Sequence, residues 1–151
     1  MKRNKDTLLD ELVTLGCTTR EIDGATLLTL PEDDGEFIYE RMGNWLYLGT
    51  TFMAAEELED SVHTSRLDRF LLELQHRNLG CRFSYDQAGF LTIGSDLGPE
   101  QQQAEKVMEI LEHMLFVIES SILLCDQVLD SGEMPDDREV DEAFGLNDNL
   151  H

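Results

Sequence analysis

The sequence predicts an α+β fold in which short antiparallel strands form a sheet and helices pack on one face of it. Apolar residues recur at helical spacing near both ends of the chain, several short segments alternate apolar and polar residues, and turns rich in Gly separate those segments. Strands joined by hairpins favour an antiparallel sheet over a doubly wound one. We expect about five strands, in the order α-β-β-β-α-β-β-α.

The N-terminal part is predicted to hold one helix followed by three or so strands. Residues 6–15 place Leu8, Leu12 and Leu15 on one helical face, and Gly16 ends the helix. Strand signals follow in segments separated by turns that contain Gly or Pro: a weak one at 20–22, then 25–30, 36–42 and 45–52.

The strand at 45–52 is the clearest of these. Trp45 and Tyr47 point to one side of it and Leu46 and Leu48 to the other, because successive side chains of a strand alternate. If the leucines face the helices, the two aromatic residues face away from them. Two interpretations are open: an exposed aromatic stripe, typical of interface hot spots, or a stripe covered by the tail or a loop.

The C-terminal part is predicted to hold a second helix, a hairpin and a long last helix. The second helix covers residues 64–79, and the hairpin strands cover 81–85 and 90–93. The last helix covers 99–130, with Pro at its favoured first position. The first hairpin strand, which begins at Cys81, is a candidate edge strand that pairs across a two-fold axis.

The last helix carries two adjacent apolar seams, although one seam would hold it on a small domain. The first seam consists of Val107, Ile110, Met114, Val117, Ser121, Leu124 and Val128. The second consists of Leu111, Leu115, Ile118, Ile122, Cys125 and Leu129. Either both seams lie in the core, or part of the second forms an interface. In the latter case the predicted dimer contact consists of Leu111, Leu115, Ile118 and Ile122.

The chain is predicted to form one domain over residues 1–132 and an acidic C-terminal tail over 133–151. The tail holds seven acidic residues and one basic residue, which favours a solvated, flexible segment. The alternative is docking of a patch with helical spacing, formed by Val140, Ala143, Phe144 and Leu146.

The charge balance argues against several classes of partner. The chain has 32 acidic and 11 basic residues, a net charge of −21. Recognition of phosphate needs clustered Lys and Arg, so we expect no binding of nucleic acid and no insertion into membranes. A basic partner and plain solubility are both consistent with this charge. Neither a secretory signal nor an apolar run of membrane-spanning length is recognisable, and the three cysteines are far apart, so we expect a cytoplasmic protein.

Motifs that carry chemistry are not recognisable in the sequence. The four histidines form no His-Glu-x-x-His pattern, and zinc spacing, phosphate-binding Gly loops and a nucleophile elbow are missing. We therefore expect a binding protein that needs no cofactor and no metal, rather than an enzyme. A small-ligand protein or an enzyme with a site hidden from the sequence is the alternative.

Three features occur together over residues 6–130. The first is Leu8-Leu9-x-x-Leu12-x-x-Leu15-Gly16 followed by short strands. The second is the helix end Leu71-Leu72-Glu73-Leu74-Gln75-His76-Arg77-Asn78, which leads into Gly80-Cys81-Arg82-Phe83-Ser84-Tyr85-Asp86 and Gly89-Phe90-Leu91-Thr92-Ile93. The third is a long closing helix in a small acidic chain. Together they resemble the class I type III secretion chaperones of the Tir-chaperone kind and the related YbjN-like proteins.

The resemblance implies a homodimer that holds an extended segment of a client protein, such as a secreted effector, partly by adding a strand to a sheet edge. It places near the client groove Leu8, Leu12, Leu15, Trp45 and Tyr47. It places near the dimer axis the junction that includes Leu74, Cys81 and Phe83. A YbjN-like regulatory or adaptor protein without a role in secretion is the alternative.

Overall fold

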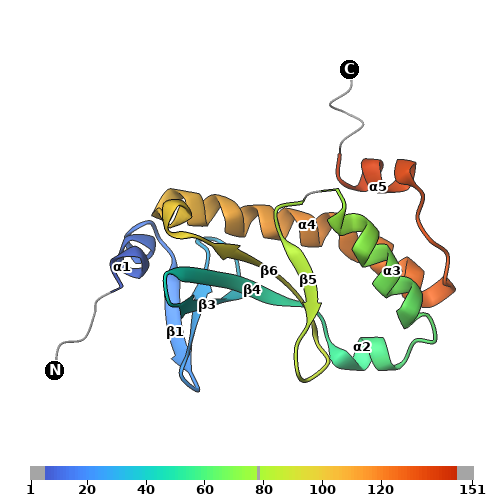
Figure 1. The fold of residues 1–151 in the computed structure, drawn as a ribbon, viewed down its shortest axis with the longest axis horizontal. Helices are drawn as coiled ribbons and strands as arrows, with labels where there is room; N and C mark the ends of the chain where they lie inside the picture. The colour runs from blue at the N-terminus through green and yellow to red at the C-terminus, as the bar shows by residue number, and fades with distance from the viewer. Residues whose placement is uncertain (1–5, 78, 146–151) are drawn as a thin grey trace. The chain divides into compact units, whose positions relative to one another are not determined.

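The computed structural model describes residues 6–77 and 79–145, which form an α+β fold with a six-stranded sheet (Figure 1). The helices are α1 (Thr7–Thr14), α2 (Ala55–Glu59), α3 (Thr64–Gln75), the 3-10 helix η1 (Pro99–Gln101), α4 (Ala104–Ser131) and α5 (Asp137–Ala143). The strands are β1 (Thr18–Ile22), β2 (Ala25–Thr29), β3 (Glu36–Met42), β4 (Trp45–Met53), β5 (Arg82–Tyr85) and β6 (Leu91–Leu97). This architecture confirms the predicted fold class, with six strands instead of about five because the weak segment at 20–22 pairs with β2.

The strands follow the order β1-β2-β3-β4-β6-β5 across the sheet. The ladders from β1 to β4 are antiparallel and are joined by tight turns at Asp23-Gly24 and Gly43-Asn44. Asp23 adopts a positive φ of 51° and Gly24 one of 81°, the left-handed pair that a two-residue hairpin requires. Strands β1 and β5 lie at the two edges of the sheet.

The described chain divides into two compact units. The first unit comprises residues 6–50 and 94–113, so it holds α1, β1 to β3 and parts of β4, β6 and α4. The second comprises residues 51–93 and 114–145, with α2, α3, β5, α5 and the remaining parts of the shared elements.

In the first unit, one face of the sheet is buried. Leu46 and Leu48 of β4 are fully buried, as their alternation with Trp45 and Tyr47 predicts. Neighbouring strands complete this face with Leu28, Phe37 and Tyr39. The helices of this unit contribute further buried side chains, among them Leu8, Leu12, Val107 and Leu111.

The second unit has its own hydrophobic core. The apolar stripes of α3 and α4 provide much of it, through Leu67, Phe70, Leu71, Leu74, Val117, Cys125, Val128 and Leu129. Phe52 and Phe83 meet edge to face with their ring centroids 5.5 Å apart.

The segment 133–145 differs from the flexible tail that the sequence analysis favoured. Val140 and Phe144 are buried in the core of the second unit, and the Phe144 ring meets that of Phe116 at a centroid distance of 5.9 Å. Burial of two apolar side chains stabilises this segment despite its acidic composition. The docking alternative therefore describes residues 133–145, and Leu146 lies outside the described residues.

The last helix begins at Ala104 and not at Pro99 as predicted. Pro99–Gln101 form a 3-10 turn, and Gln102 leaves the helical conformation. The side-chain amide of Gln102 donates hydrogen bonds to the carbonyl oxygens of Asn44, at 2.8 Å, and Leu97, at 3.1 Å. The contact with Asn44, which is 58 positions away in the chain, holds Gln102 outside the helix, and the apolar spacing along α4 does not report it.

Candidate functional site

The sheet of the first unit leaves its second face open to solvent. The register places Ile38 of β3 between Leu27 of β2 and Gly49 of β4, and it places Met42 opposite Trp45. Side chains directly opposite each other in a ladder share one face of the sheet. We use the name open sheet face for the apolar residues on this side: Ile22, Leu27, Ile38, Met42, Trp45 and Tyr47.

Several of these side chains are strongly exposed for apolar residues. The exposed fractions are 46% for Ile22, 39% for Ile38, 48% for Met42 and 50% for Trp45. Because they come from β1, β3 and β4, they form a patch across neighbouring strands and are not scattered singly. Contiguous apolar patches on a protein surface are typical of interaction sites.

Two glycines allow the Tyr47 ring to lie against the sheet. A Cβ atom on Gly49 would lie 2.6 Å from Tyr47 Cζ, and one on Gly94 would lie 2.7 Å from Tyr47 Cε1. Side chains at either position would therefore push the ring away from the strands. The absence of side chains at these two positions makes this part of the open sheet face flat.

Charged residues border and interrupt the open sheet face. Arg20 and Glu36 form a two-armed ion pair across β1, β2 and β3, with N···O distances of 2.6 and 2.8 Å. Glu40 is exposed and lies directly opposite Tyr47 in the ladder of β3 and β4. Among the described residues, Glu40 makes no ion pair or hydrogen bond through its side chain.

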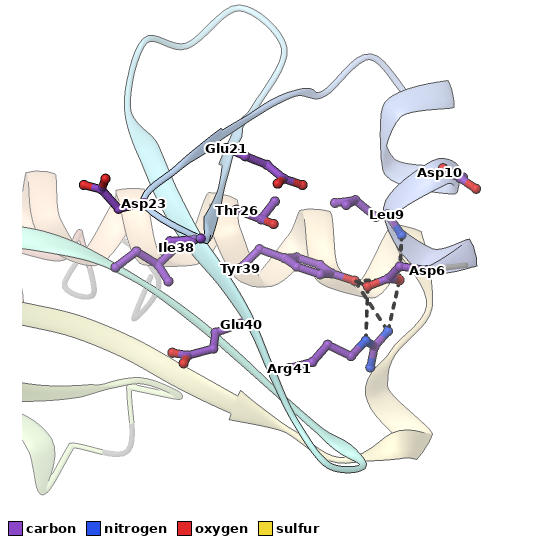
Figure 2. Close-up of a pocket in the computed structure, with 12 residues that line it drawn as sticks. Asp6, Leu9, Asp10, Glu21, Asp23, Thr26, Ile38, Tyr39, Glu40 and Arg41 are labelled. Carbon is purple, nitrogen blue, oxygen red and sulfur yellow. Dashed lines mark hydrogen bonds and ion pairs between the residues drawn. The ribbon is translucent and has the colours of Figure 1, made fainter. Parts of the chain in front are cut away.

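A cleft of about 940 Å³ lies between α1 and the first three strands, and its lining also includes Ile38 and Glu40 of the open sheet face (Figure 2). Figure 2 shows Tyr39 and Arg41 pointing toward Asp6 at the start of α1, whereas Ile38 and Glu40 point away from it. Besides Asp6 and Glu40, the acidic lining residues are Asp10, Glu21 and Asp23.

The Asp6 carboxylate connects the two walls of this cleft by accepting hydrogen bonds from four donor groups. Its carboxylate accepts from the Leu9 backbone N–H at 3.1 Å, from the Tyr39 hydroxyl at 2.9 Å, and from Nε and Nη2 of Arg41 at 3.2 Å each. Burial by itself raises the pKa of Asp6, but the hydrogen bonds from Arg41, Leu9 and Tyr39 outweigh it and the pKa is lowered. Burial and the neighbouring Asp6 carboxylate raise the pKa of Tyr39. The cluster is thus a structural fastening between α1 and β3.

The structure separates the residues that the sequence analysis placed near a client groove. Trp45 and Tyr47 lie on the open sheet face, with Trp45 half exposed. Leu8 and Leu12 are buried, on the helix that packs at the opposite side of the sheet (Figure 2), while Leu15 is exposed. Leu8 and Leu12 are therefore not brought together with the two aromatic residues.

Three residues of the open sheet face were not singled out from the sequence. Ile22, Ile38 and Met42 are separated in the chain. The strand register places Met42 opposite Trp45 and puts Ile22 and Ile38 on the same face of the sheet. The two hairpin turns contain the signal that would have found them. A tight turn at Gly43-Asn44 sets Met42 opposite Trp45, and alternation then places Ile38 on the same face.

The residues predicted at a dimer interface fall into two groups. Leu74 and Leu111 are fully buried within the chain, whereas five others are half-buried: Cys81, Phe83, Leu115, Ile118 and Ile122. On the β5 edge, the Phe83 backbone N–H donates to Gln75 Oε1 at 2.6 Å. This hydrogen bond occupies one of the donors that strand pairing across an axis would use. On α4, sequence reasoning missed the exposed side chains of Phe116 and Leu123.

Reactive and metal-binding groups are sparse in the described chain. Within residues 6–77 and 79–145, no group of three or more His, Cys, Asp and Glu side chains is arranged to hold a metal ion. Burial raises the pKa of Cys81 to about 11, and burial together with Asp126 raises that of Cys125 to about 12, so both thiols are protonated at neutral pH. None of the helices in the described part combines the length and apolar character needed to cross a bilayer.

Comparison with solved structures shows a similar fold in a chain of the crystal structure of the ExsC–ExsE complex. The alignment covers 78% of this chain and 90% of that chain, with a TM-score of 0.50 and 13% sequence identity. At this identity the likeness concerns the fold alone. No family model matches the sequence, and no curated protein matches it.

Proposed function

We propose that this chain is a protein-binding module whose open sheet face holds an extended segment of another protein. The observation that carries the proposal is the exposure of Ile38, Met42 and Trp45 on one face of a regular sheet. Covering these side chains removes apolar surface from water, which is the main favourable term in protein association. Trp and Tyr are also enriched among residues that dominate binding energy.

The shape of the face suits an extended ligand. The two glycines leave a flat region beneath the Tyr47 ring, and the apolar residues spread over several strands. An extended segment presents alternate side chains to one surface and so matches such a patch. The protein with a similar fold was crystallised in a complex of two proteins, which also supports a protein partner.

The resemblance to class I type III secretion chaperones leads to a more specific form of this proposal. In that form the chain is a cytoplasmic chaperone, and the bound segment belongs to a client that a secretion system exports. The protein is then a homodimer, and the surface of α4 that includes Ile118, Ile122 and Leu123 is the candidate contact between copies.

The proposal is tested on a partner co-purified from the native host, with affinities measured by calorimetry. The test variant carries two substitutions, Trp45→Ala and Met42→Ala. We expect it to bind the partner at least about 30-fold more weakly than the wild type, the loss typical of a hot spot. Both side chains are half exposed, so the melting temperature should change little.

The matched control is Val62→Ala, which removes an apolar side chain that is 88% exposed and lies outside both the open sheet face and α4. We expect this variant to bind the partner as the wild type does. If the double variant with Trp45→Ala and Met42→Ala binds the partner as tightly as the wild type does, the open sheet face is not the binding surface.

A further inference from the structure

Glu40 is the one carboxylate at the centre of the open sheet face as the described residues define it. On β3 it stands between Ile38 and Met42, and across the ladder it faces Tyr47. Its nearest neighbours on this face are therefore apolar or aromatic. Solvent hydrates the carboxylate in the free protein, since the side chain is exposed.

The arginines closest to Glu40 in the register are already engaged elsewhere. Arg41 points to the opposite side of the sheet, where it binds Asp6 (Figure 2). Its guanidinium also donates to the side chain of Gln102. Arg20 lies on the same face as Glu40 but is held by both carboxylate oxygens of Glu36. Rearrangement of either arginine toward Glu40 would break these bonds.

Any molecule that covers this face must take Glu40 out of water. Burying a carboxylate without a partner costs several kcal/mol, whereas a paired cation offsets much of that cost. A purely apolar segment would thus bind at a penalty. A segment with a cation at the matching position would avoid the penalty and would also place that cation beside the rings of Trp45 and Tyr47, which attract positive charge.

The same face of a second copy of this chain does not meet the requirement. The chain carries a net charge of −21, and on the open sheet face the described cation is Arg20, which Glu36 already neutralises. Contact between two such faces would bring Glu40 of each copy into a surface without an available cation. Charge complementarity therefore favours a different protein.

We propose that the segment held on the open sheet face carries a Lys or Arg that pairs with Glu40 and is flanked by apolar residues that cover Ile38, Met42 and Trp45. This inference rests on the proposed function and adds the chemistry of the partner. Glu40 then acts as a selector: it admits apolar segments with a central basic residue and rejects those that are uncharged or acidic at that position.

The probe is a random peptide library displayed on phage and selected against the immobilised full chain. Three proteins are compared in the selection: the wild type, Glu40→Lys, and Glu119→Lys, which makes the same charge change at an exposed position of α4. Glu40→Gln is added for the titrations. Selected peptides are synthesised and titrated by the fluorescence of Trp45, the single tryptophan of the chain. Because Trp45 lies on the face itself, its emission reports occupancy directly.

We expect the wild type and Glu119→Lys to select apolar peptides with a Lys or Arg, and Glu40→Lys to select apolar peptides with an acidic residue. Replacing the basic residue of a selected peptide by Gln should weaken its binding to the wild type about tenfold or more, and its binding to Glu40→Gln much less.

Two other outcomes would count against the inference in different ways. Peptides that shift the Trp45 emission but have the same charge pattern for all three proteins would overturn the role of Glu40 and leave the proposed function standing. Failure to select any peptide whose binding depends on Trp45 would overturn both.

Discussion

At the scale of single residues, successive side chains of β3 point to opposite faces of the sheet and have different roles. Tyr39 and Arg41 form hydrogen bonds with Asp6 at the start of α1, while Glu40 between them lies on the open sheet face. Asp6 is visible in the sequence as a helix cap, and it does cap α1 through the Leu9 N–H. Its bonds to β3 were not predictable, because they join residues 33 and 35 positions apart.

Asp6→Asn tests the fastening between α1 and β3. Asn retains a carbonyl oxygen that caps α1, but it lacks the charge that Arg41 and Tyr39 bind. We expect a loss of about 1 to 2 kcal/mol in the free energy of unfolding at pH 7, measured by urea denaturation. The control is Asp10→Asn, an exposed carboxylate on the same helix, which should change stability by less than about 0.5 kcal/mol.

The effect of Asp6 should depend on pH. Its pKa is lower in the folded protein than in the unfolded chain, so its charge stabilises the fold above the unfolded pKa. That stabilisation declines as the pH falls toward the folded pKa and is lost below it. The difference in the free energy of unfolding between the wild type and Asp6→Asn should therefore decrease from neutral pH toward about pH 3. If this difference stays constant with pH, the charge of Asp6 is not the cause of the added stability.

At the scale of elements, α5 is an acidic segment whose composition did not decide whether it packs on the fold, and its contacts show that it does. Asp136 caps the helix, and Arg77 at the end of α3 binds Asp141 at 2.7 Å and Asp137 at 3.0 Å. Asp137 is exposed and the Arg77–Asp141 pair is only partly buried, so each ion pair contributes little. The buried side chains of Val140 and Phe144 are therefore the main hold on α5.

Phe144→Ala is expected to release α5 and to lower the free energy of unfolding by about 3 kcal/mol, because it removes a large buried ring. Limited proteolysis of the variant should cut in the segment 133–143, which the wild type protects. Asp137→Ala, at a side chain that is 98% exposed, is the control and should leave protection unchanged. Equal protection in both variants would show that Phe144 does not hold the helix.

At the scale of the whole molecule, exposed apolar side chains are concentrated in a few regions of the described surface. It includes the open sheet face and the side chains of Phe116 and Leu123 on α4, with Leu123 exposed by 76%. The sheet face holds a carboxylate at its centre, which suits a basic partner. The α4 surface is the candidate contact between two copies.

Leu123→Asp tests the proposed homodimer by sedimentation equilibrium. We expect the wild type to sediment as a dimer and the variant as a monomer, because a charge at an apolar contact must be desolvated without a partner. The fold should persist, since Leu123 does not belong to the core. Val62→Asp, at a side chain exposed by 88% outside α4, should remain a dimer. A monomeric wild type would contradict the homodimer.

The sequence by itself determined the fold class, most of the elements and the opposite orientations of Trp45 and Leu46. These follow from spacing along the chain, since helices and strands impose periods of 3.6 and 2 residues on neighbouring positions. The acidic composition and the lack of a recognisable catalytic motif were likewise evident without coordinates.

Only the tertiary structure decided which apolar residues meet and which stay exposed. Leu111 and Leu115 occupy one seam of α4, yet the first is fully buried and the second half-buried. Ile38 joined Trp45 in the candidate site through strand register, and Val140 entered the core through contacts with distant elements. Spacing along one segment cannot report these pairings, because burial depends on segments that are remote in sequence and close only after folding.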